Sequence, residues 1–220
     1  KEGDGLVDVT THLVDLIQWE LYPNEILDTT DVSMLDAKLW STLLSSGQYE
    51  QVTGRIAPFP EENPLAVNCN GEMNYTLKGV HAKVSVIWDF QAPEGAGDTH
   101  FSKMRGTKAN LIIRQGKEEN YLPELYIEVL SDQKDQIVAF IEGDLQQKFR
   151  GIGWKSISEQ EIKLEIPNNY RVGHEAHFGQ VTEGFLSYFK EGGLPDWEVP
   201  NMLVKYYTTT SASALAKDKK

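Results

Sequence analysis

The hydrophobic and polar positions of this 220-residue chain change period several times along its length. Near the start, apolar residues recur at helical spacing and predict a helix that ends at Pro23 and faces the core with Leu13, Leu16, Ile17 and Leu21. The same spacing, with turn and cap residues at the ends, predicts helices over residues 45–53, 132–148, 174–190 and from 200 onward. The Ala/Ser/Lys-rich tail, residues 211–220, is expected to fray into solvent.

Alternating patterns mark the strands, which are expected over residues 27–40, 66–69, 73–77, 83–90, 99–105, 109–114, 125–129 and 162–166. Asn70-Gly71 separates two of these runs and predicts a hairpin turn, because both residues tolerate positive φ. Since most strands follow one another through short turns, antiparallel pairing is favoured. We predict an α+β fold in one domain over residues 1–220, with an open-faced, mostly antiparallel sheet covered by helices on one face.

Charge and cysteine content exclude several classes of partner and site. The chain has 33 acidic and 21 basic residues, a formal charge of −12, so it lacks the basic footprint of a nucleic-acid binder and is a poor match for an anionic membrane. No apolar run approaches the roughly 20 residues of a membrane span. The single cysteine, Cys69, excludes an internal disulfide framework and a cysteine-rich zinc site. Neither feature decides between cytoplasm and periplasm.

The clearest candidate for acid–base chemistry is the pair Asp8 and His12. Four residues apart at a helix entry, their side chains can project to one side. A carboxylate beside an imidazole fixes its tautomer and suits it to proton transfer near neutral pH. Spacing alone leaves open the alternative of a capping aspartate and a histidine held within the packing.

Two further histidine-containing segments and one glycine-rich loop are candidates for binding chemistry. His174 and His177 can share a helix face, but no third ligand is identifiable, so no metal site is predicted. His100 lies at the mouth of a glycine-rich loop, where functional residues concentrate, although a turn-stabilising Asp98 is the commoner explanation of such a pattern. The loop has the glycines of Gly95-Ala96-Gly97 but neither the third glycine nor the following helix of a dinucleotide site.

Several motifs together resemble a known enzyme family. The run Asp8-x-x-x-His12-x-x-Asp15-Leu16-x-x-Trp19 resembles the motif that opens the second domain of the Gfo/Idh/MocA oxidoreductases, named for glucose–fructose oxidoreductase, inositol dehydrogenase and a rhizopine-catabolism protein. Residues 86–100, 104–110 and 200–207 resemble the branch described as the putative oxidoreductase C-terminal domain. The resemblance covers essentially the whole chain.

The resemblance implies a two-domain enzyme that moves hydride between NAD or NADP and a sugar, polyol or related carbonyl compound. An N-terminal Rossmann domain would bind the dinucleotide, and the α+β domain would supply the substrate side and the oligomer interface. By position, His12 would be the proton acceptor and Asp8 would orient it. Asp15, Trp19 and His100 are the expected substrate contacts.

The chain departs from the family where the first domain would be. The family's Glu-Lys-Pro motif, whose lysine assists catalysis, and the glycine-rich fingerprint are not found in the sequence. We therefore expect this chain to be the second domain of a longer protein, inactive alone and without a tightly bound dinucleotide. Two alternatives remain: an NAD-dependent glycoside hydrolase of the same family, or a non-catalytic sugar-binding or dimerisation module.

The expected partners are a carbohydrate-like substrate, the protein's own N-terminal domain and a second copy of the chain. A sheet with helices on one face leaves its other face bare, and Ile87 and Leu130 make that face mixed rather than purely polar. Pairing two such faces across a two-fold axis would cover it. The alternative is that charged residues such as Lys83, Asp89 and Glu128 keep the face solvated.

Overall fold

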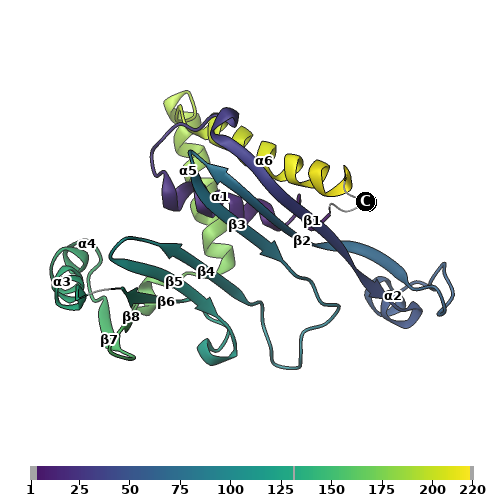
Figure 1. Ribbon diagram of the computed structural model, residues 1–220, viewed down its shortest axis with the longest axis horizontal. Coiled ribbons are helices and arrows are strands. Elements are labelled where there is room, and N and C mark those ends of the chain that lie inside the picture. Colours follow the sequence, from purple (N-terminus) through teal and green to yellow (C-terminus); the bar gives the residue numbers. More distant parts are fainter. Residues whose placement is uncertain (1–3, 131, 219–220) are drawn as a thin grey trace. The chain divides into compact units, whose positions relative to one another are not determined.

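The computed structural model describes residues 4–130 and 132–218, which form two compact units (Figure 1). The first unit combines both ends of the chain, residues 4–91 and 186–218, and the second comprises residues 92–185. Helix α5 (His174–Glu191) runs across the boundary between these ranges. Each unit has its own antiparallel sheet and its own hydrophobic core.

The first unit holds a three-stranded antiparallel sheet in the order β1-β2-β3. Its strands are β1 (Val32–Leu44), β2 (Leu65–Leu77) and β3 (Val80–Val86), and its helices are α1 (Thr10–Leu21), α2 (Ser46–Thr53) and α6 (Glu198–Asp218). In Figure 1 the yellow helix α6 lies along β1, and α1 contacts both α6 and β3.

One hydrophobic core joins the inner face of this sheet to α1 and α6. Its buried residues are Leu6, Val14, Leu27, Val32, Ala37, Leu39, Met73, Tyr75, Leu77, Ala82, Val84, Val204, Ala212 and Ala216, with Leu13 and Ile17 packed against them. The other face of the sheet carries polar residues such as Glu72 and Lys83, which form an ion pair of 2.8 Å. Helices α1 and α6 pack against the inner face.

The second unit holds a five-stranded antiparallel sheet in the order β4-β5-β6-β8-β7. Its strands are β4 (His100–Arg105), β5 (Ala109–Gln115), β6 (Glu124–Val129), β7 (Gly153–Ser156) and β8 (Glu161–Glu165), and its short helices are α3 (Lys134–Phe140) and α4 (Gln146–Lys148). A π-helical turn, Ile141–Leu145, connects the two helices. The core of this unit is Ile127, Val129, Ile141, Ile152, Ile162 and Leu164.

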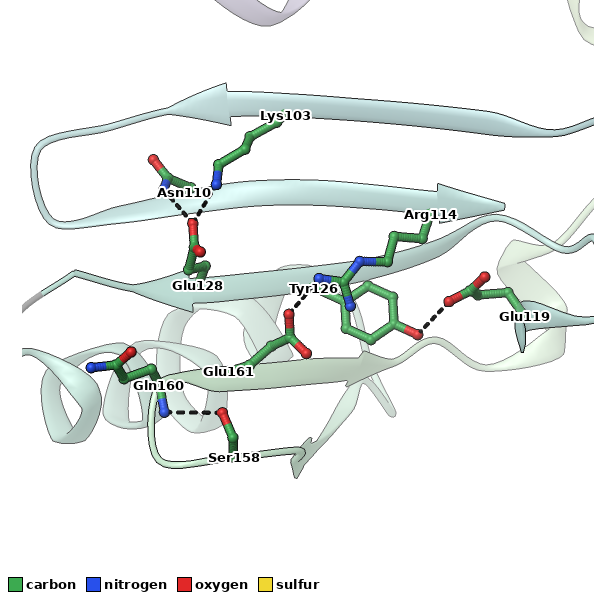
Figure 2. Close-up of polar contacts among 9 residues, drawn as sticks. All are labelled: Lys103, Asn110, Arg114, Glu119, Tyr126, Glu128, Ser158, Gln160 and Glu161. Carbon is green, nitrogen blue, oxygen red and sulfur yellow. Dashed lines mark hydrogen bonds and ion pairs between the residues drawn. The ribbon is translucent and has the colours of Figure 1, made fainter. Parts of the chain in front are cut away.

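The opposite face of the five-stranded sheet is covered with charged side chains that pair across strands. Figure 2 shows Lys103 and Asn110 converging on Glu128, and Arg114 of β5 reaching Glu161 of β8. The Lys103–Glu128 distance is 2.6 Å. Each ion pair reaches across an intervening strand: Lys103 of β4 and Glu128 of β6 lie on either side of β5, and Arg114 of β5 and Glu161 of β8 lie on either side of β6.

The predicted α+β class and antiparallel pairing are confirmed, with one difference in organisation. The strands form two separate sheets rather than one. The paired strands predicted over 99–105 and 109–114 are β4 and β5. Helix α2 is confirmed too: Ser45 and Gln48 form a capping box, and Gly54 ends the helix with φ of 66°.

The predicted hairpin turn at Asn70-Gly71 is wrong. Both residues lie inside β2, which continues unbroken from Leu65 to Leu77 and pairs with β1 on one side. The turn between β2 and β3 is formed instead by Lys78-Gly79, whose φ angles are 48° and 80°. Two successive positive φ values are what a tight hairpin turn requires, and Lys78-Gly79 meets that requirement after the full length of the strand.

Other element boundaries differ from the predicted ones for local reasons. The first strand begins at Val32 rather than Leu27, because Asp28 and Asp31 form a capping box around a 3-10 turn over residues 29–31. The predicted helix over 132–148 begins at Lys134 and is interrupted by the π-helical turn, and β7 was not predicted. Residues 211–218 of the tail are helical rather than frayed, and residues 219–220 lie outside the described part of the chain.

Candidate active site on helix α1

Helix α1 carries His12 and is anchored through its opposite side. Thr10, Val14 and Gln18 are buried at intervals of one turn. Leu16, which was predicted to face the core, is 47% exposed. It lies about 200° around the helix from Val14, so it faces the solvent when Val14 faces the sheet. The side of the helix that bears His12 therefore faces the solvent, while the opposite side is buried.

His12 and Asp8 are both exposed. Asp8 precedes the helix, and its backbone carbonyl accepts hydrogen bonds from Thr11 N at 3.0 Å and Thr11 Oγ1 at 2.7 Å. Within the described part of the chain, no hydrogen bond or ion pair joins the Asp8 and His12 side chains. His12 is thus an accessible base on a well-anchored helix, and its orientation by Asp8 stays a prediction.

Asp15 and Trp19, the two predicted substrate contacts on this helix, each meet a residue from the other end of the chain. Asp15 Oδ1 lies 3.3 Å from Lys205 Nζ on α6. The Trp19 ring contacts that of Trp197, which precedes α6, with ring centroids 5.8 Å apart and planes at 82°. This edge-to-face arrangement is a favourable one for aromatic rings. The two contacts follow α1 along its exposed side, beginning one turn after His12.

Neither Trp197 nor Lys205 was found by the sequence analysis. They are separated from α1 by nearly the whole chain, and neither falls in a motif with catalytic spacing. The only signal was the resemblance of residues 200–207 to the family, which includes Lys205 without assigning it a role. Their place beside α1 depends on α6 packing against the same sheet.

His100, the third predicted substrate contact, belongs to the second unit. It is the first residue of β4, pairs with Gln115 of β5, and is half-buried. Burial lowers the pKa of its imidazole below the ordinary value, because the charged form loses hydration. His12 and His100 thus lie in different units, and the cluster of His12, Asp15 and Trp19 on α1 does not include His100.

The glycine-rich loop does not have the geometry of a dinucleotide site. Gly95 has φ of 76° within a turn in which Ala96 N donates to Pro93 O at 2.9 Å. A Cβ at Gly97 would lie 3.2 Å from that of Tyr121, so this glycine allows side-chain packing. Strand β4 follows, whereas a pyrophosphate site needs a helix N-terminus there. These residues do not fit a dinucleotide.

Metal ligands and membrane-spanning helices are the remaining features to consider in the described part of the chain. The proposed pairing of His174 with His177 lies outside what is described, because the His174 side chain is not placed. In residues 4–130 and 132–218, no group of three His, Cys, Asp or Glu side chains is arranged to hold a metal ion. No helix in these ranges is long and apolar enough to cross a membrane.

The fold and the site describe an α+β domain that presents an accessible histidine on an anchored helix. Residues 1–217 match the family model for the putative oxidoreductase C-terminal domain, and the chain belongs to this family. No curated protein matches the chain.

The chain is also similar to a solved structure, that of a putative oxidoreductase from Parabacteroides merdae ATCC 43184. The two share 52% sequence identity with a TM-score of 0.94. The match covers 99% of this chain and 52% of that one, so this chain spans about half the length of the similar protein.

Proposed function

We propose that this chain is the substrate-side domain of an NAD(P)-dependent oxidoreductase of the Gfo/Idh/MocA type, acting on a sugar, polyol or related carbonyl compound. The motif around His12 and the family membership support the proposal. The length of the similar protein leaves room for a further domain of comparable size, which would hold the dinucleotide. NAD or NADP would accept or deliver the hydride, and this chain would bind the substrate and move the proton.

In this proposal His12 takes the proton from a substrate hydroxyl as the carbon that bears it is oxidised, and returns it in the reverse direction. The observation that carries the assignment is the exposed imidazole on a helix whose other side is buried through Val14 and Gln18. An anchored helix holds a base at a constant position, which proton transfer to a bound substrate requires. Asp8 would orient the imidazole once the substrate and the other domain are present.

The test replaces His12 by alanine in the whole enzyme and measures NAD- and NADP-dependent oxidation of a panel of aldoses and polyols. A general base contributes roughly 10²–10⁴-fold to rate, so His12→Ala should lose at least about a hundredfold in kcat with the fold intact. The matched control is His81→Ala, since His81 is an exposed histidine on β3. A loss of only a few-fold for His12→Ala, equal to the control, would contradict the assignment.

The same assay separates the oxidoreductase from the hydrolase of the same family. An oxidoreductase accumulates reduced dinucleotide in step with product. A glycosidase that uses its dinucleotide transiently would release nitrophenol from nitrophenyl glycosides without net reduction. Turnover of the second kind would replace the proposed reaction while keeping His12 as the proton-transfer residue.

A further inference from the structure

The exposed side of α1 continues beyond His12 as a surface shared with α6. We name the four side chains that form it, Asp15, Trp19, Trp197 and Lys205, the α1–α6 wall. His12, Asp15 and Trp19 fall within about 60° of one another around the helix, so they face the same side. A substrate held at His12 would therefore extend along the wall.

The aromatic half of the wall contains an exposed indole ring, that of Trp19. Trp19 is 61% exposed although it contacts the Trp197 ring edge-to-face. Two rings at 82° form a corner, and most of the Trp19 side chain stays accessible beside it. An exposed indole face is a surface on which the C–H bonds of a saturated ring can lie, because those bonds are weakly positive and the face is weakly negative.

The polar half of the wall is an ion pair, in which the opposite charges of Asp15 and Lys205 sum to zero. Asp15 Oδ1 and Lys205 Nζ are 3.3 Å apart, and their side chains are 41% and 20% exposed. The carboxylate can still accept hydrogen bonds and the ammonium can still donate them. Because each charge is compensated by its neighbour, the pair offers hydroxyl recognition without attracting an anion.

We propose that the α1–α6 wall binds an uncharged polyhydroxylated ring beside His12 and discriminates against its carboxylated and phosphorylated analogues. The proposal rests on the proposed function, in which His12 faces the substrate, and adds the charge class of the ligand and two positioning residues, Lys205 and Trp197. Lys205 compensates the charge of Asp15 and holds its carboxylate in place, and its ammonium can donate to a hydroxyl. Trp197 supports the Trp19 ring through their edge-to-face contact.

The test follows the indole N–H signals of the 220-residue chain by NMR. The chain has five tryptophans, so five signals are expected, and single Trp→Phe variants assign them. The probes are D-glucose and myo-inositol, compared with D-glucuronate and glucose 6-phosphate at equal ionic strength. The signals of Trp19 and Trp197 should shift with the two neutral probes, while that of Trp154, in the second unit, should not.

Two substitutions separate recognition from simple packing of α1 on α6. Lys205→Met should weaken binding of the neutral probes by about tenfold, since it removes the ammonium donor and the partner that positions the Asp15 carboxylate. Asp15→Asn should reverse the selectivity, because the uncompensated Lys205 then attracts the anionic probes. The matched controls are Lys38→Met and Asp89→Asn, exposed positions of the same unit, which should leave the titrations unchanged.

If the Asp15–Lys205 contact had only a packing role, these substitutions would change the free energy of unfolding and leave the order of the probe affinities unchanged. Absence of any Trp19 or Trp197 shift in the unsubstituted chain would overturn the proposal. Equal binding of neutral and anionic probes would overturn the stated charge class, and an unreversed order in Asp15→Asn would overturn the role of the pair. Each of these failures leaves the His12 assay standing, and a failed His12 assay with probe binding intact would reject only the proposed reaction.

Discussion

Asn70 and Gly71 are both buried in the middle of β2. The side chain of Asn70 makes hydrogen bonds there, and Gly71 leaves room for a neighbouring side chain. The Asn70 amide donates to Thr42 Oγ1 at 2.9 Å, and its oxygen accepts from Trp88 N at 2.7 Å. It thus joins β1 to the segment after β3, where regular pairing has ended. A Cβ at Gly71 would lie 2.7 Å from the Leu6 side chain, which is fully buried. A dipeptide typical of turns is used here for hydrogen bonding and close approach.

This close approach predicts a specific loss of stability. Gly71→Ala should lower the free energy of unfolding by about 1–3 kcal/mol, because the added methyl group overpacks the contact with Leu6. Urea denaturation of the 220-residue chain measures it. The matched control is Gly47→Ala in α2, where a Cβ would meet nothing within 4 Å, and it should be neutral or stabilising. Equal stabilities of the two variants would contradict this role of Gly71.

At the scale of elements, α6 is held along its whole length. Its last turns, predicted to fray, bury Ala212, Ser213 and Ala216. Asp4 binds this end of the helix: its Oδ2 accepts from Ser213 Oγ at 2.7 Å and lies 2.9 Å from Lys217 Nζ. The helix that supplies Lys205 to the α1–α6 wall is thereby fixed at its C-terminal end by a residue that precedes α1.

The Asp4 contacts predict a pH-dependent contribution to stability. Partial burial tends to raise the pKa of Asp4, but hydrogen bonds from Lys217, Ser213 and the Leu6 amide outweigh it and lower the pKa below its ordinary value. The contribution is therefore present above the pKa of the unfolded chain, about 4, and is lost as pH falls through the folded pKa.

Asp4→Asn should accordingly cost about 1–2 kcal/mol of unfolding free energy near pH 7, and the difference from the unsubstituted chain should shrink toward about pH 3. Urea denaturation at a series of pH values measures both. Asp89→Asn, at an exposed position, is the control and should track the unsubstituted chain throughout. A difference that persists unchanged in acid would show that the shape of the side chain matters rather than its charge.

For the whole molecule, the open face of the five-stranded sheet is the surface that we propose for pairing with a second copy. Its charges are arranged in opposite pairs, Lys103 with Glu128 and Arg114 with Glu161 (Figure 2). Arg114 also lies 4.4 Å from the centroid of the Tyr126 ring. Alternating charges on a flat face are self-complementary, because a two-fold rotation can bring acids of one copy onto bases of the other. Phe101, on the edge strand β4, adds an exposed apolar side chain.

Light scattering coupled to size exclusion should therefore give the mass of two chains at micromolar concentration, and high salt should lower it. Arg114→Glu should yield single chains, because it places like charges beside Glu161 on both copies. Lys83→Glu is the matched control: it breaks an ion pair with Glu72 on the sheet of the first unit and should leave the dimer intact. A mass of one chain that does not change on concentration would reject pairing through this sheet.

The amino-acid sequence by itself determined the features that depend on neighbours a few residues apart. The Ser45–Gln48 capping box, the β4–β5 hairpin and the helix that bears His12 were predictable because capping, alternation and helical spacing act locally. The family resemblance located His12, but no periodic pattern distinguishes an exposed histidine from a packed one.

Tertiary structure alone decided the rest, because it brings together residues that are far apart in the chain. The strands are divided between two sheets, since residues 92–185 pair among themselves while both ends of the chain share one core. Asn70 became a buried hydrogen-bonding residue because Thr42 and Trp88 come to lie beside it. Trp19 and Asp15 met Trp197 and Lys205 only through the packing of α6 against α1, and local spacing carries no information about such a contact.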